Sequence, residues 1–191
     1  MLTGEDPGRA VIIDPGMNPG ALIKKIEPLT IEAILLTHAH FDHMGGVDEI
    51  RKLKNCPVYL HDLEADWLEN PKLNGSLNWP QVSPPLSTRP CRIWLGRRAE
   101  AGVDRPHFHG VPYAGAFAGK RQLFVRGRPV FGDVLFKLGV GRTDLYGGRE
   151  RDLLDSIQNK LFAFKDEVKV YPGHGPKTTI GYERAHNPYV S

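Results

Sequence analysis

The sequence predicts an α/β fold in which strands and helices alternate along the chain. Residues 10–13 form a short β-branched run that ends at the turn formers Asp14-Pro15-Gly16. Two more apolar runs of strand length, 31–37 and 57–60, follow at intervals that leave room for a helix. Because the intervening segments carry apolar residues at helical spacing, the order is strand, helix, strand, helix, which is typical of layered α/β proteins.

The first half contains three expected helices between and after these strands. The first follows Pro19-Gly20 and covers residues 21–26. The second covers 47–53, where Val47, Ile50 and Leu53 recur at helical spacing, and the third covers 62–68.

The second half resumes the same alternation. Apolar residues at three- and four-residue steps predict a helix over 151–164 that packs on one face. We expect strands at 131–136 and 167–171, and a closing helix over 176–186 that is weakened at Gly181. Between about residues 80 and 128 the chain is rich in Arg, Pro and Gly, so we expect an irregular region at about 80–130. The sequence leaves the structure of this region open.

Length and composition limit the classes of protein that fit. A chain of 191 residues with 40% hydrophobic content suits one domain, residues 1–191. The net charge is only +3, from 25 basic and 22 acidic residues, and long like-charge runs are absent from the sequence. These features do not favour a nucleic-acid partner.

The N-terminus is polar within three residues and lacks the basic and apolar regions of a secretory signal. The sequence contains no apolar run of membrane-spanning length. Cys56 and Cys91 form no CxxC motif, so we interpret them as reduced thiols. We therefore expect a cytoplasmic protein without a membrane partner, and the sequence leaves its oligomeric state open.

The most informative motif is the run Thr37-His-Ala-His-Phe-Asp-His-Met-Gly-Gly46, directly after an expected strand. In an extended chain alternate side chains share a face, so His38 and His40 can hold one ion. Asp42 and His43 follow once the chain turns and can face a second ion. Surface or core histidines without a metal are the alternative, but this spacing with a carboxylate and a Gly-Gly turn favours a metal site.

This run, Gly132-Asp133 and Pro172-Gly-His174 together resemble the metallo-β-lactamase superfamily, and within it the glyoxalase II-like (hydroxyacylglutathione hydrolase-like) branch. Segments 139–145, 171–175 and 183–188 are also similar to that branch. The resemblance covers residues 10–70 and 130–190. It implies a four-layer αββα sandwich, with two mixed sheets face to face, helices outside and the metals at one edge of the sheets.

The resemblance also implies a ligand set for two divalent metal ions, expected to be zinc, with iron or manganese as alternatives. A third histidine would join His38 and His40 on the first ion. The His-x-x-Gly spacing selects His107 for this role, with His109 as the second choice. The second ion would be held by Asp42, His43 and His174, with Asp133 bridging the two ions.

Two departures from the family pattern stand out. Both candidate third histidines lie farther from Asp133 than is usual in the family. One hypothesis is that residues 91–131 derive from a shifted reading frame, so that the chain binds metal but is catalytically impaired. Relatives also begin with one more strand before residues 11–13, and we therefore expect the sandwich to be incomplete at the N-terminus.

The implied reaction is hydrolysis of a small-molecule thioester of a low-molecular-weight thiol by a metal-bound hydroxide, which Asp42 would orient as the catalytic residue. Arg142 matches a substrate-side basic position and would hold a carboxylate of the thiol; its alternative role is a solvated loop arginine. The chain ends at Ser191, without the helical extension that supplies much of the glutathione site in full-length glyoxalase II. The thiol therefore stays open.

Two other activities share parts of this pattern. Persulfide dioxygenases have the same His-rich run and a Gly-Arg-Thr-Asp segment, but they use one iron held by two histidines and one aspartate. A β-lactamase proper is less expected, because those enzymes are exported and this sequence shows no signal.

Overall fold

A computed structural model describes residues 1–3, 6–94, 108–112, 121–125, 128–130 and 132–190, with side chains left undescribed over 92–130. The chain divides into two compact units, Met1–Leu95 and Gly96–Ser191. The expectation of a single domain stays a prediction. In the described part of the chain, no helix is long and apolar enough to cross a membrane.

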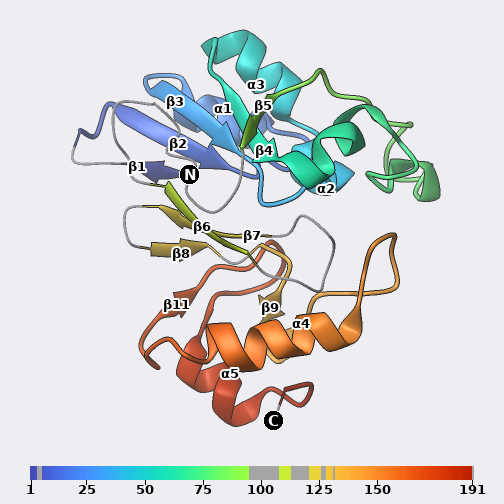
Figure 1. Ribbon diagram of the computed structural model, residues 1–191. Coiled ribbons are helices and arrows are strands. Elements are labelled where there is room, and N and C mark those ends of the chain that lie inside the picture. The colour runs from blue at the N-terminus through green and yellow to red at the C-terminus, as the bar shows by residue number, and fades with distance from the viewer. Residues whose placement is uncertain (4–5, 95–107, 113–120, 126–127, 131, 191) are drawn as a thin grey trace. The chain divides into compact units, whose positions relative to one another are not determined.

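The first unit is built on a five-stranded sheet with the order β1-β2-β3-β4-β5 (Figure 1). Strand β1 pairs antiparallel with β2, and the other neighbours are parallel. The strands are β1 (Leu2–Thr3), β2 (Arg9–Ile13), β3 (Thr30–Leu35), β4 (Val58–His61) and β5 (Arg92–Trp94). The expected strands at 10–13, 31–37 and 57–60 are therefore confirmed to within two residues at each end.

The helices of this unit lie between the parallel strands, as a parallel connection requires. Helix α1 (Gly20–Ile26) joins β2 to β3, and α2 (Phe41–Met44) and α3 (Val47–Lys54) join β3 to β4. After β4 the chain forms the 3₁₀ helices η1 (Asp62–Glu69) and η2 (Ser76–Asn78). The helix expected over 62–68 is thus 3₁₀ rather than α.

The core of the first unit comes from the apolar strand positions and one face of each helix. Parallel strands covered on both faces read as near-continuous apolar runs, which is why β2 and β3 were visible in the sequence. On α3, Val47 and Ile50 are fully buried, but Leu53 is 56% exposed although it shares their spacing. The largest fully buried side chains are Ile12, Ile26, Ile34, Leu35, Leu36, Met44, Ile50, Leu60 and Leu68.

The structure contains a strand at the N-terminal edge, where the sequence predicted an incomplete sheet. Strand β1 has two residues, and Leu2 pairs with Val11 while Thr3 pairs with Ala10.

Both cysteines are free, as expected. Burial raises the pKa of the Cys91 thiol to about 11 and also raises that of Cys56, so both are protonated thiols at neutral pH.

The second unit contains a three-stranded antiparallel sheet, β6-β7-β8, and two short hairpins, β9-β10 and β11-β12. Strands β6 (Phe108–Pro112), β7 (Arg121–Val125) and β8 (Arg128–Val130) fall in the stretch expected to be irregular. A strand ladder is built from backbone hydrogen bonds, which most residue types can supply, although Pro112 and Pro129 can only accept them. The sequence left the structure of this stretch open, and its described residues form an antiparallel sheet.

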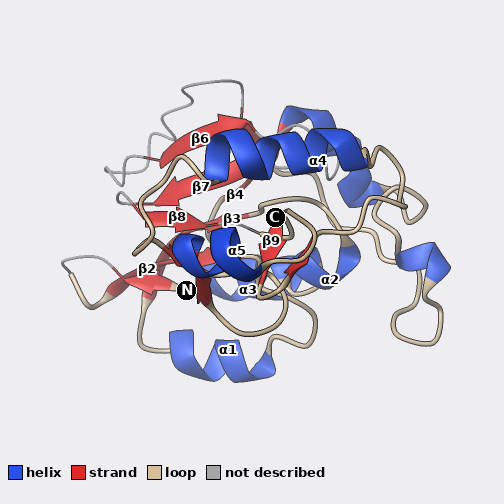
Figure 2. Ribbon diagram, turned by 90° about the horizontal axis from the view of Figure 1, so that it is seen from below, coloured by secondary structure: helices blue, strands red, loops and turns tan. Residues whose placement is uncertain are grey.

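The remaining elements follow the predicted order with shorter bounds. Strands β9 (Leu135–Phe136), β10 (Gly139–Val140), β11 (Lys169–Val170) and β12 (Thr178–Thr179) have two residues each. Helix α4 (Glu150–Ser156; Figure 2) continues into a π-helical turn, η3 (Ile157–Leu161). Leu153, Ile157 and Leu161 are buried. The helix predicted over 151–164 is thus confirmed.

The closing helix, α5 (Ile180–His186), begins later than the predicted residue 176. Residues Thr178–Thr179 instead pair with β11, and the Thr179 hydroxyl caps the helix by accepting from the Tyr182 N–H at 3.2 Å. The strand expected over 131–136 shortens to β9, preceded by an isolated bridge from Gly132 to Pro172.

A buried polar network ties α5 to the β9-β10 turn. One carboxylate oxygen of Glu183, which is fully buried, accepts from the Leu138 N–H at 2.8 Å and from the Asn187 side-chain amide at 2.9 Å. The same Asn187 amide donates to the Gly139 carbonyl at 3.0 Å. These bonds hold Leu138 in the left-handed region, at φ +59°, and fix the turn before segment 141–144.

Gly141, the first residue of this segment, has no room for a side chain. Its N–H donates to the Val134 carbonyl at 3.0 Å, and a Cβ built on it would lie 2.1 Å from the Asp133 carbonyl oxygen. The clash is with backbone, which cannot rotate away as a flexible side chain can.

We expect Gly141→Ala to lower the free energy of unfolding by about 1–3 kcal/mol, because the backbone must move to accept the methyl group. Urea denaturation measures this change. Gly20→Ala is the matched control, since nothing lies within 4 Å of its added Cβ, and it should be neutral or slightly stabilising. Equal stabilities for the two variants would contradict the close approach at Gly141.

Candidate metal centre

The His-rich run lies at the carboxyl edge of the parallel strands β2 and β3. Ile13 pairs with Leu35 at the ends of these strands, and the Asp14 N–H donates to the Leu35 carbonyl at 3.0 Å. Residues that follow the two strands therefore meet at one edge, where ligand sites of parallel α/β sheets commonly form. The loop after β3 carries the histidines, and the loop after β2 begins with Asp14.

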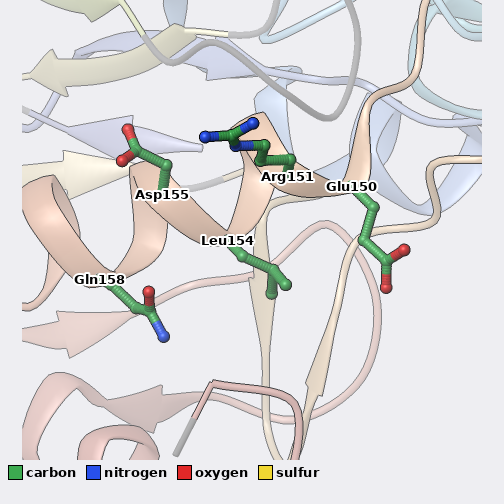
Figure 3. Close-up of a pocket in the computed structure, with 5 residues that line it drawn as sticks. All are labelled: Glu150, Arg151, Leu154, Asp155 and Gln158. Carbon is green, nitrogen blue, oxygen red and sulfur yellow. The ribbon is translucent and has the colours of Figure 1, made fainter.

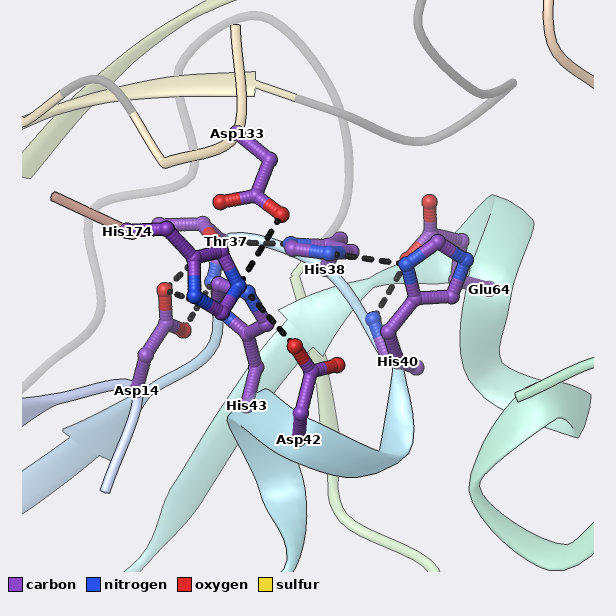
Figure 4. A network of polar contacts seen from close by, with 10 residues as sticks. Asp14, Thr37, His38, His40, Asp42, His43, Glu64, Asp133 and His174 are labelled. Atoms are coloured by element: carbon purple, nitrogen blue, oxygen red, sulfur yellow. Dashed lines mark hydrogen bonds and ion pairs between the residues drawn. The ribbon is translucent and has the colours of Figure 1, made fainter. Parts of the chain in front are cut away.

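Asp14 binds both ends of the His-rich loop (Figure 4). Its Oδ1 accepts from the Thr37 N–H at 2.8 Å, and its Oδ2 accepts from the Thr37 hydroxyl at 2.6 Å. The same Oδ2 lies 3.0 Å from Nδ1 of His43. Asp14 has φ +43°, a left-handed conformation that Asp tolerates better than most residues. One carboxylate thus joins the start of the loop to helix α2.

These bonds determine the protonation of Nδ1 in two of the histidines. The Thr37 hydroxyl gives its proton to Asp14, so it accepts from Nδ1 of His38, 3.0 Å away. The carboxylate of Asp14 can only accept, so Nδ1 of His43 carries the proton of that bond. An imidazole that is protonated on Nδ1 alone has its lone pair on Nε2, as in metal-binding histidines whose other nitrogen is hydrogen-bonded.

His38 and His40 present nitrogens to a common point. Nε2 of His38 lies 3.1 Å from Nδ1 of His40, and the two rings meet edge to face. Two imidazoles bound at about 2.0–2.1 Å to one tetrahedral zinc ion would have nitrogens on the order of 3.3 Å apart. Both rings are almost completely buried. The donor types and their spacing therefore fit a divalent metal ion.

Asp42 and His43 form a second pair on α2. Nε2 of His43 lies 3.8 Å from Oδ2 of Asp42, and the Asp42 side chain is 32% exposed. The His43 ring centroid lies 4.0 Å from that of His38, so the two pairs are adjacent. The structure thus gathers all four residues of the predicted run, while their division between two ions stays a prediction.

Atoms of Asp14, His38 and His43 also lie within 4.8 Å of one another. We assign Asp14 an orienting role, because its carboxylate already accepts from Thr37 and His43. The sequence alone did not indicate this role for Asp14, because Asp14-Pro15-Gly16 is typical of an ordinary turn. Its position at the end of a buried strand was the signal that could have identified it.

In the second unit, Asp133 and His174 are neighbours although 41 positions separate them in the sequence. Nε2 of His174 lies 3.6 Å from Oδ2 of Asp133. The Gly132–Pro172 bridge and a 3.2 Å bond from the Gly173 N–H to the Gly132 carbonyl place the two segments side by side. His174 is 58% exposed on its side chain, and Asp133 is 15% exposed. The two predicted ligands of this unit are therefore adjacent.

The third histidine stays a prediction. His107 lies outside the described residues. His109 is in β6, where its backbone pairs with Phe124, and its side chain is not described.

Arg142 forms a two-pronged ion pair with Asp144. Nε and Nη2 of the arginine donate to the two carboxylate oxygens at 2.8 and 2.7 Å. These hydrogen bonds lower the pKa of the Asp144 carboxyl from 3.8 to about 2 and raise that of the guanidinium. Both side chains are about half or more exposed, so the pair is accessible from solvent.

A groove on α4 is a separate feature of the second unit (Figure 3). Its lining side chains include two carboxylates and one arginine, but no histidine or cysteine among the described residues. This set does not favour a transition metal. The lining residues are Glu150, Arg151, Leu154, Asp155 and Gln158.

The chain belongs to the metallo-β-lactamase superfamily, because the model of that family matches residues 2–174. Probable metallo-hydrolase YqgX of Bacillus subtilis is 36% identical, over 96% of this chain and 88% of that protein. Hydroxyacylglutathione hydrolase GloC of Haemophilus influenzae is 30% identical, over 100% of this chain and 91% of that protein. The glyoxalase II-like branch inferred from the motifs is consistent with these relatives.

Two crystal structures show the same fold. BLEG-1 B3 metallo-β-lactamase superposes with a TM-score of 0.90 at 41% identity, over 98% of this chain and 91% of that one. TTHA1623 in a di-iron-bound form superposes with a TM-score of 0.79 at 34% identity, over 93% of this chain and 87% of that one. The predicted metallo-β-lactamase fold is confirmed.

We expect Asp14→Asn to weaken metal binding about 10–100-fold, as loss of an outer-shell carboxylate typically does. Asn also tolerates the left-handed backbone, so the change removes mainly the charge that orients His43 and Thr37. Competition with a chromophoric chelator measures the affinity. Asp66→Asn, at an exposed position, is the control. An unchanged affinity in Asp14→Asn would refute the orienting role.

Because Asp144 is paired with Arg142, we expect its carboxylate to stay ionised at acidic pH. Since its pKa in the folded protein is depressed to about 2, the contribution of the pair to stability is complete above about pH 3.8 and is lost as the pH falls through about 2. NMR titration of the Asp144 carboxyl carbon should show this low pKa. In Arg142→Leu the pKa should return toward 3.8, and an unchanged value in that variant would contradict the pairing.

Proposed function

We propose that this metallo-hydrolase cleaves thioesters of low-molecular-weight thiols. The observation that carries the proposal is the cluster of His38, His40 and His43, with Nδ1 of His38 and of His43 hydrogen-bonded to Thr37 and Asp14, in a chain of the metallo-β-lactamase superfamily. The similarity to hydroxyacylglutathione hydrolase GloC over the whole chain supports the thioester substrate class. A small-molecule thioester is the proposed partner, and no nucleic acid or membrane takes part.

Two divalent ions, zinc or another first-row metal, would supply an activated water and polarise the substrate carbonyl. The di-iron form of TTHA1623 supports iron as an alternative to zinc. We propose that His107, Asp133 and His174 complete the ligand set of His38, His40, Asp42 and His43, as expected from the sequence.

The residues of this chain then have distinct tasks. His38, His40 and His43 would supply imidazole nitrogens to the metal, and hydrogen bonds from Nδ1 to Thr37 and Asp14 orient the rings of His38 and His43. Asp42 is partly exposed, so its carboxylate can accept a proton from the attacking water and orient it. A departing thiolate is a good leaving group and needs little help from an acid.

Arg142 is proposed to bind a carboxylate on the thiol part of the substrate. A guanidinium fork matches a carboxylate in the same two-pronged geometry that Asp144 uses. The substrate would therefore compete with Asp144 for Arg142.

The direct test is turnover of S-lactoylglutathione and S-lactoyl esters of smaller thiols, with metal content measured on the same sample. We expect His38→Ala to abolish metal-dependent turnover, and chelation to do the same until metal is restored. His186→Ala is the control, because His186 is an exposed residue of α5. If His107→Ala keeps full activity while His38→Ala does not, His107 is not a ligand.

Metal counting separates the hydrolase from its alternatives. Two metal ions per chain with thioester turnover support the proposal. One iron with oxygen uptake on a persulfide would instead identify a dioxygenase. Bound metal without any turnover would identify a catalytically impaired chain.

The similarity to BLEG-1 B3 metallo-β-lactamase favours β-lactam hydrolysis as a second candidate activity. A chromogenic cephalosporin assayed beside the thioesters decides between them. A higher kcat/KM for the β-lactam would make the second candidate the main activity.

The competition at Arg142 gives a further prediction. In Asp144→Asn the arginine loses its charged partner, so KM should fall several-fold for a thioester that carries a carboxylate on the thiol. A thioester without that carboxylate is the control substrate, and its KM should not change. Parallel effects on both substrates would exclude the proposed role of Arg142.

A further inference from the structure

A second buried carboxylate lies at the His-rich loop, on the other side of the histidines from Asp14 (Figure 4). Glu64 belongs to η1 and is fully buried. Its Oε2 accepts from the Ala39 N–H at 2.7 Å. Ala39 is the residue between His38 and His40, and it too is fully buried.

This bond acts on the one peptide segment that sets the spacing of the two ring nitrogens. His38 and His40 are joined through the backbone of Ala39, so a rotation there would separate Nε2 of His38 from Nδ1 of His40, now 3.1 Å apart. A carboxylate that accepts from a backbone N–H makes a short and strong hydrogen bond. Burying a carboxylate is otherwise costly, which favours a specific role for it.

The same 3₁₀ helix contacts the ring of His40. Trp67 follows Glu64 by three residues, and side chains three apart in a 3₁₀ helix lie on the same face. Its ring stacks on that of His40, with centroids 5.9 Å apart and planes at 27°. Helix η1 therefore holds the backbone before His40 through Glu64 and the His40 side chain through Trp67.

The start of η1 is fixed to the sheet. His61 ends β4, and its Nδ1 accepts from the Leu63 N–H at 3.1 Å, capping η1. Since β4 pairs directly with β3, the helix begins one strand away from the loop that it supports.

We propose that Glu64 is a positioning residue for the metal centre, which acts by holding the Ala39 N–H so that His38 and His40 keep the spacing of two ligands on one ion. This inference rests on the metal site of the proposed function. It assigns Glu64 no contact with metal or substrate.

Two variants of Glu64 separate the effect of side-chain length from the effect of charge. Glu64→Gln keeps the length of the side chain and an oxygen that can accept from Ala39, but it removes the charge. Glu64→Asp keeps the charge and is one methylene too short for the bond. Glu69→Gln and Glu69→Asp are matched controls, because Glu69 is an exposed residue of the same helix.

The measurements are zinc affinity by chelator competition and the visible absorption spectrum of the cobalt-substituted protein, with thermal unfolding of the metal-free protein as a check on folding. We expect Glu64→Gln to bind zinc within a few-fold of the wild type. Glu64→Asp should bind about 10–100-fold more weakly and change the cobalt spectrum. Both Glu69 variants should match the wild type.

Wild-type affinity and spectrum in Glu64→Asp would overturn the inference, and so would an equal loss in Glu64→Gln, which would assign the effect to charge. If Glu64→Asp does not fold, Glu64→Met takes its place, since it has similar length and no carboxylate, and the same loss is expected. A wild-type protein that binds no metal would refute the proposed function as well, whereas tight wild-type binding with an unaffected Glu64→Asp refutes this inference alone.

Discussion

The carboxylate of Asp14 is the interaction on which the His-rich loop depends. It accepts from the Thr37 backbone and hydroxyl and from the His43 ring, so it fixes the entry to the loop and the first turn of α2 together. The Thr37 hydroxyl donates to Asp14 and therefore accepts from Nδ1 of His38. One acidic group thus determines the tautomer of two histidines. Without it, Thr37 and His43 would lose the carboxylate that joins them.

The sheet makes this arrangement possible. Parallel pairing of β2, β3 and β4 puts the carboxyl ends of all three strands at one edge, so Asp14, the histidines and η1 follow neighbouring strands. Gly46 completes the junction: its N–H donates to the Gly16 carbonyl at 2.7 Å, and a Cβ there would lie 2.9 Å from the Pro19 ring. The Gly-Gly pair of the motif thus serves packing rather than chemistry.

The second unit relies on buried polar contacts in the same way. Glu183 and Asn187 hold the β9-β10 turn, and Gly141 allows the following segment to pass against the Asp133 backbone. Several residues that resemble the glyoxalase II-like branch therefore have a structural role in this chain. They support the segments that carry Asp133 and Arg142.

The sequence by itself determined the α/β class, most strands and helices of the first unit, and the ligand types in His38 to His43, because hydrophobic period and motif spacing are local properties. It did not reveal β6 to β8, because their pairing rests on backbone bonds and their sequence shows no sustained strand alternation. It also did not assign roles to Asp14 or Glu64, which look like ordinary turn and helix residues. Only the tertiary structure decided those roles, since Asp14 can orient these residues only when the fold brings it to Thr37 and His43, which lie 23 and 29 positions later in the sequence.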